Sequence, residues 1–67
     1  MTSAEFLSAL AAAGLSRRSL AETLGVHIVT VNRWATGALD VPQHVQAYLE
    51  ITLALRAARE EIAALIE

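Results

Sequence analysis

The sequence contains no cysteine and no lysine, and only one proline, one phenylalanine, one tryptophan and one tyrosine. Without cysteine the chain forms no disulfide, and His27 and His44 alone do not make a structural zinc site. We therefore expect no metal and no cofactor.

Charged residues such as Glu50 and Arg56 interrupt the longest apolar stretches. This pattern predicts no membrane partner, and with no export signal we expect a cytoplasmic location.

Large apolar side chains are also scarce. A chain of 67 residues makes one domain, which we place over residues 1–67. Such a chain buries only about 60% of its unfolded surface. Much of the 55% hydrophobic content is alanine, so the core is small. Because disulfides and metals are excluded, the sequence favours a homodimer as the means of adding to that core.

The residue types needed for catalysis are missing as well. There is no cysteine nucleophile, no phosphate-binding glycine loop, and no histidine with a partnered carboxylate and hydroxyl nearby in sequence. We interpret the adjacent Glu60 and Glu61 as a solvated acidic face and not as a catalytic pair. We expect no catalytic residue, no enzymatic activity and no small-molecule ligand.

The residues that are present predict an all-helical fold. Thr2 and Glu5 have the spacing of a capping box, which places a helix start near residue 3. Phe6, Leu7 and Leu10 would form the buried stripe of this helix, and Gly14 would end it. We expect a head formed by residues 2–41, followed by a helix over residues 42–67.

Residues 16–37 have the pattern of two short helices joined by a tight turn. Ser16 is a good N-cap, and Leu20, Ala21 and Leu24 give the first helix one apolar stripe. Gly25 suits the left-handed conformation that ends such a helix, and Gly37 repeats this signal for the second. The spacing of Val31 and Trp34 predicts that both face the core.

The C-terminal stretch contains no glycine or proline after Pro42. Asp40 and Gln43 resemble a second capping box, so the helix start is open by a residue or two. The remainder predicts one helix of about 37 Å, at 1.5 Å per residue. A break near Ala57 and Ala58, folding the helix back on the head, is the alternative.

Apolar residues recur in this C-terminal stretch every seven positions, as in the seam of a short coiled coil. We expect the dimer interface to consist of Tyr48, Ile51, Leu55, Ala58, Ile62 and Leu65.

Residues 16–37 resemble the Cro/C1-type helix-turn-helix of small bacterial and phage repressors. The resemblance is carried by Arg17, Ala21, Gly25, Val31 and the run Asn32-Arg33-Trp34, followed by Thr36-Gly37. In size and layout the chain is also similar to the anti-CRISPR-associated autoregulators of phages. The resemblance implies a compact helix-turn-helix head that binds double-stranded DNA.

In a helix-turn-helix the second helix enters the major groove. On this chain the resemblance places that helix over residues 27–36. Asn32 could then bond adenine through N6 and N7, and Arg33 could bond guanine or reach only a phosphate. The expected base contacts are His27, Ile28, Val29, Asn32 and Arg33. The expected phosphate contacts, which would position without selecting sequence, are Arg17, Arg18, Thr30 and Thr36.

Three of these residues depart from the family pattern. Ile28 and Val29 stand where polar residues are usual. They either meet thymine methyl groups, or one of the two, with Val29 as the better candidate, turns partly inward against Leu20 or Leu24. His27 stands where the family has serine or threonine, and we expect it to cap the helix poorly.

The net charge of −2 disfavours a nucleic-acid partner until its distribution is considered. Residues 14–37 hold three arginines and one glutamate, whereas the five acidic residues of 38–67 lie outside this segment. The sequence therefore predicts a homodimeric transcriptional regulator that binds an inverted repeat and associates with the nucleoid through DNA. Nothing in the residues separates a repressor from an activator. An antitoxin-type autoregulator and a helical protein-interaction module without DNA binding remain alternatives.

Overall fold

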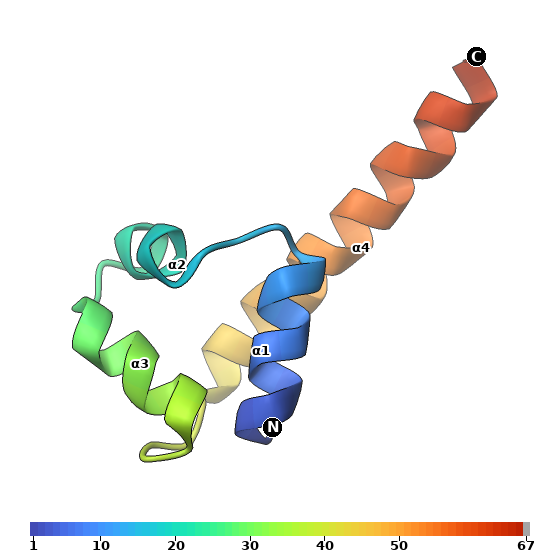
Figure 1. Cartoon of the computed structure of the whole chain (residues 1–67). Coiled ribbons are helices and arrows are strands. Elements are labelled where there is room, and N and C mark those ends of the chain that lie inside the picture. The colour runs from blue at the N-terminus through green and yellow to red at the C-terminus, as the bar shows by residue number, and fades with distance from the viewer. Residues whose placement is uncertain (67) are drawn as a thin grey trace.

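The computed structural model of the chain describes residues 1–66, and these residues are all-helical, as the sequence predicts. Three short helices form a head, and one long helix runs from it (Figure 1). Glu67, to which we extended the last helix, lies outside the described residues. The elements are α1 (Ser3–Ala12), α2 (Arg17–Leu24), α3 (Ile28–Thr36) and α4 (Gln43–Ile66).

The start of α1 confirms the expected capping box. The Thr2 hydroxyl accepts from the Glu5 backbone N–H at 3.1 Å, and the Thr2 N–H donates to the Glu5 carboxylate at 3.2 Å. The bond from the Thr2 backbone N–H to the ionised carboxylate is the largest cause that lowers the pKa of Glu5 from its ordinary value. At the other end Gly14 adopts a left-handed φ of +72°, and the Leu15 N–H bonds back to the Leu10 carbonyl. Both ends of α1 are therefore fixed by local hydrogen bonds.

The core lies where α1, α3 and the first half of α4 meet, with α2 packed on α3. Trp34 is 4% exposed, and its ring meets the Phe6 ring edge-on with 6.0 Å between centroids. The prediction that Trp34 and Val31 face inward is thus confirmed. Leu7, which we expected to be buried, is exposed, because α3 and α4 cover only the face of α1 that carries Phe6 and Leu10. The buried cluster is Phe6, Leu10, Leu20, Ala21, Val31, Trp34, Ala35, Val41, Val45 and Leu49.

The start of α4 differs from the expected capping box. No hydrogen bond joins Asp40 to Gln43 in the described chain. Instead the Pro42 carbonyl accepts the backbone N–H groups of Val45 and Gln46. The Gln46 side-chain amide donates to the Val41 carbonyl at 3.1 Å. The box was wrong because Pro42 itself begins the hydrogen-bonding pattern of the helix, which leaves Asp40 outside it.

Beyond the head, α4 continues without interruption to Ile66 and projects away from the other helices (Figure 1). The alternative of a break near Ala57 and Ala58 is therefore wrong. The Arg56 guanidinium packs against Gly14, so close that a Cβ on this glycine would overlap it. Every described residue after Leu53 is exposed. The projecting half of α4 thus has little contact with its own chain.

Among residues 1–66 no helix combines the length and apolar character needed to cross a bilayer. Within the same range no three side chains of the metal-binding types gather into a cluster that could hold an ion.

Candidate functional site

The candidate site is the edge of the head formed by the start of α2, the following turn and the outer face of α3. The start of α2 is held by Ser16, whose hydroxyl accepts from the Ser19 N–H at 3.0 Å. The Ser19 hydroxyl in turn accepts from the Ser16 N–H at 2.9 Å. Ser16 was predicted as a cap, whereas the reciprocal role of Ser19 was missed. The spacing of Ser16 and Ser19, three apart, was the available signal.

The turn between α2 and α3 is short because Gly25 allows the chain to reverse at once. Its φ is +70°, and the next residue, Val26, donates its backbone N–H to the Ala21 carbonyl at 3.0 Å. The Val26 side chain packs against the core. This arrangement is a Schellman motif, which ends α2 and fixes the direction in which α3 begins.

His27 caps α3, contrary to the expectation that it would cap poorly. Its Nδ1 accepts a hydrogen bond from the Val29 backbone N–H at 3.1 Å. An accepting Nδ1 carries no hydrogen, so the neutral ring has its hydrogen on Nε2. The exposed ring therefore satisfies an otherwise unpaired amide at the helix start and keeps one donor for another molecule.

Ile28 and Val29 differ in exposure, and Ile28 is the one that turns inward. Ile28 is half-buried and packs against the core, whereas the Val29 side chain is 44% exposed. The alternative in which Val29 turns inward is wrong, because α3 is oriented by the burial of Val31 and Trp34, and Val29 then falls on the opposite face. Of the two apolar residues, Val29 is the one available for contact with another molecule.

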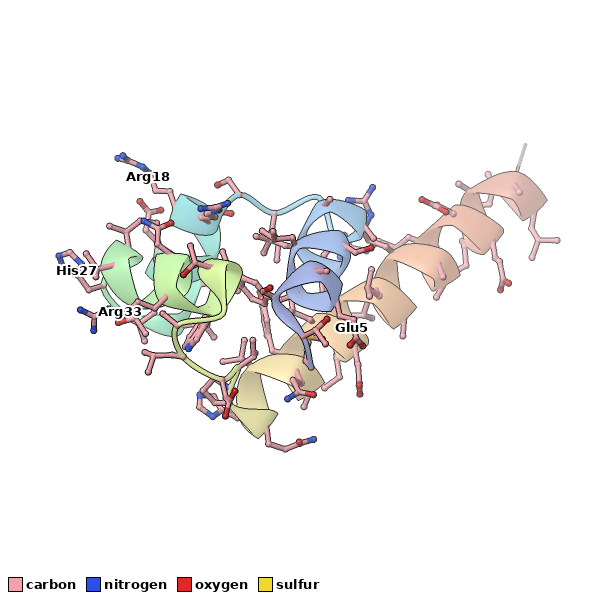
Figure 2. All side chains as sticks on the ribbon, turned by 60° about the horizontal axis from the view of Figure 1, so that its bottom comes forward. Glu5, Arg18, His27 and Arg33 are labelled. Atoms are coloured by element: carbon pink, nitrogen blue, oxygen red, sulfur yellow. The ribbon has the colours of Figure 1, made fainter. Side chains whose placement is uncertain are left out.

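The basic side chains of the site are exposed. Arg18 and Arg33 are both exposed, and with His27 they project from one edge of the head, on the side away from the free end of α4 (Figure 2). The Thr36 hydroxyl donates to the Arg33 carbonyl at 3.3 Å, so its hydrogen is already used within α3. Thr30 is half-buried. The edge thus offers mostly hydrogen-bond donors from arginine and histidine.

Arg17 and Asn32 are joined across the two helices. Arg17 Nη1 donates to Asn32 Oδ1 at 3.2 Å, although the residues are 15 positions apart. Arg17 is exposed and Asn32 half-buried. No sequence signal predicts this pair, since the contact depends on how α2 crosses α3. The residues expected to contact phosphate and base are therefore in direct contact with each other.

The residues expected at the dimer interface divide into two groups. Tyr48 is half-buried and packs against the core, so it belongs in part to the head. Further along α4, Ile51, Leu55 and Ile62 are 61%, 56% and 56% exposed, and Leu65 is 86% exposed. Ala58 lies between them and is also exposed. The projecting half of α4 therefore carries an apolar stripe that its own chain does not cover.

No family model, curated protein or solved structure matches this chain.

Proposed function

We propose that this protein is a sequence-specific regulator of transcription that binds double-stranded DNA as a homodimer, with α3 in the major groove. The observation that carries the proposal is the edge where α2 carries exposed Arg17 and Arg18 and α3 carries exposed Arg33, with Arg17 hydrogen-bonded to Asn32 across the two helices. These residues come from two helices whose relative position is fixed by buried Leu20, Ala21, Val31 and Trp34. The resemblance of residues 16–37 to Cro/C1-type repressors supports the same function, and repression itself follows from that resemblance alone.

The chemistry of this edge suits duplex DNA. Arginine guanidinium groups bind phosphate oxygens and guanine edges through paired donors, and a helix fits the width of the major groove. Val29 is positioned on the outer face of α3, where an apolar group can meet a thymine methyl. Glu60 and Glu61 belong to the projecting half of α4 and so do not oppose the phosphate backbone at this edge.

The uncovered stripe of α4 supports dimerisation. A helical segment of this length with few tertiary contacts is only marginally stable in water. A second copy of α4 would cover Ile51, Leu55, Ile62 and Leu65 in the manner of a coiled coil and supply the missing contacts. Two reading helices related by a two-fold axis would then bind the two halves of an inverted repeat.

Fluorescence anisotropy with labelled duplex DNA of random sequence tests the proposal. We expect binding at low salt, with log K falling by about 0.9 per unit of log salt concentration for each phosphate neutralised. Arg33→Ala should weaken binding, because Arg33 lies on the proposed contact edge. Arg59→Ala is the matched control, since it removes the same charge from the projecting part of α4 and should leave the affinity almost unchanged. Equal loss in both variants would show that only total charge matters.

A second candidate function is a helical protein-interaction module. The exposed apolar side chains of Val29 and Leu39, each 44% exposed, favour it. Such a module would leave the anisotropy of duplex DNA unchanged at low salt. Its failure to bind DNA, with the fold intact by circular dichroism, would favour this second function over the first.

A further inference from the structure

The hydrogen bond between Arg17 and Asn32 gives Arg17 a role beyond contact with phosphate. Among residues 1–66 it is the only hydrogen bond between side chains of two different helices. Both ends are held in place: Ser16 and Ser19 fix the first turn of α2, and buried Val31 precedes Asn32 in α3. The contact is therefore a defined feature of the α2–α3 edge.

This bond determines which end of the Asn32 amide faces outward. An asparagine amide has an accepting oxygen and a donating NH₂ group, and an unrestrained side chain can present either end. Here the oxygen is turned toward the Arg17 guanidinium, and a charged donor makes such a bond stronger than a neutral one. The NH₂ group is left as the free end of Asn32. Arg17 uses one of its five N–H donors in this bond and keeps the others.

Arg17 and Asn32 together thus present donors from two helices. In the major groove guanine offers two acceptors, N7 and O6, whereas adenine offers one acceptor and one donor. A surface made of donors matches guanine. The adenine N6 donor meets only the second lone pair of Asn32 Oδ1, because Arg17 already occupies the first. This changes the expectation, drawn from the sequence alone, that Asn32 reads adenine through both of its amide groups.

We propose that Arg17 and Asn32 form one base-reading unit, in which Arg17 holds the Asn32 amide so that the pair selects guanine over adenine. The proposal rests on the proposed function, because it specifies how the DNA-binding edge reads a base. Arg17 acts as a positioning residue through Asn32, and its removal should free the amide to turn its oxygen outward. Without Arg17 the same Asn32 should accept adenine.

The bond itself is tested in the free protein. We expect Arg17→Met to move the Asn32 side-chain amide resonances in an NMR spectrum, since the variant removes the donor on Oδ1. Arg18→Met is the matched control. It removes the same charge from the neighbouring exposed position and should leave these resonances in place. Unmoved Asn32 resonances in Arg17→Met would overturn the proposal whether or not the protein binds DNA.

The preference for guanine over adenine is tested on DNA. Selection from a randomised duplex library with the full chain gives the preferred site. Guanine-to-adenine changes at each selected guanine then give the ratio of affinities by anisotropy. We expect a preference for guanine of about 10-fold at one position per half-site in the unmodified protein. Arg17→Met should abolish or reverse it, while Arg18→Met should weaken both duplexes and keep the ratio.

Asn32→Ala and the double variants complete the test. Asn32→Ala should abolish the preference at the same position, and adding Arg17→Met should then change the ratio no further. The Arg18 and Asn32 substitutions should act additively. An unchanged ratio in Arg17→Met would show that Arg17 contacts only phosphate, while DNA binding by the protein stands. Absence of binding by the unmodified protein would overturn the proposed function, and the base-reading role with it.

Discussion

Single side chains determine where three of the helices in this chain begin. Thr2, Ser16 and His27 each accept a backbone N–H that would otherwise be unpaired. The first two are ordinary caps, whereas His27 uses a ring nitrogen. The same residues set the direction of the following helix, so the position of the α2–α3 edge depends on a few hydrogen bonds at exposed sites.

Glu5 makes the stability of α1 depend on pH. Its pKa is lowered in the folded chain, mainly by the hydrogen bond from the Thr2 backbone N–H. A lowered pKa means that the contribution to stability is complete above the ordinary value of 4.5 and is lost as the pH falls through the lowered pKa. Glu5→Gln keeps an accepting oxygen that does not titrate. We expect chemical denaturation to show an advantage of the unmodified protein that shrinks on acidification. An advantage that grows instead would contradict the assignment.

Arg33 is expected to contribute to sequence selection on DNA. It is exposed on the outer face of α3 and, unlike Asn32, makes no side-chain hydrogen bond within residues 1–66. Arg33→Ala should cost about 1–3 kcal/mol per half-site and relax the preference at one base pair. Binding constants for the selected site and for single-base variants measure this. If cognate and random DNA are weakened equally, Arg33 contacts phosphate.

At the scale of the elements, sequence and structure agree best where the determining contacts are local. The caps at Thr2 and Ser16 and the left-handed Gly25 involve partners within a few residues, so their spacing alone predicted them. The exposure of Leu7 and the burial of Ile28 in place of Val29 depend on the angles at which helices cross. The Arg17–Asn32 pair depends on the same geometry. Periodicity gives the apolar face of a helix to within about one residue position, and this margin decides which of two neighbours is buried.

Trp34 anchors α3 to α1, which makes it a residue of the core. It is 4% exposed and packs edge-on against Phe6. Trp34→Ala should lower the free energy of unfolding by about 3–5 kcal/mol, because it removes a large buried side chain from a small core. Urea denaturation followed by circular dichroism measures this. A variant that keeps full stability and loses only DNA affinity would contradict the structural role.

Substitutions at Gly25 and Gly14 distinguish the cost of a left-handed backbone from the cost of a steric contact. Gly25 has a φ of +70°, and a Cβ there would meet nothing within 4 Å. Gly25→Ala should therefore cost about 1–2 kcal/mol of stability through the left-handed conformation alone. Gly14→Ala adds a contact with the flexible end of Arg56, which can rotate into solvent. We expect similar losses in the two variants, measured by urea denaturation. A much larger loss at Gly14 would show that Arg56 is held in place.

The whole molecule consists of a small head and a helix that extends well beyond it, with principal extents of 44, 21 and 17 Å. The head buries the few large apolar residues of the chain, and the apolar residues of the projecting half of α4 have no partner within residues 1–66. In the proposed dimer α4 packs on the core with its first half and on the second subunit with its projecting half. Association and head stability are then coupled, because α1 packs on the helix that pairs.

Leu55 lies in the middle of the apolar stripe and tests this coupling. It is 56% exposed in the single chain, so a charge there costs little in a monomer. In the dimer the same charge would lie between two helices without a partner, which is strongly unfavourable. Leu55→Asp should therefore give monomers in sedimentation at micromolar concentration. The unmodified dimer should unfold at a temperature that rises with protein concentration. Ala57→Asp is the matched control.

Ala57→Asp adds the same charge two residues away, at a position outside the stripe that carries Ile51, Leu55 and Ile62. It should leave both the dimer and its concentration-dependent unfolding in place. Because α1 rests on the first half of α4, Leu55→Asp should also lower the unfolding temperature of the head at concentrations where the unmodified protein is dimeric. It should weaken binding to an inverted repeat more than binding to a single half-site. An unmodified protein that sediments as a monomer at micromolar concentration would show that the stripe of α4 does not pair with a second copy.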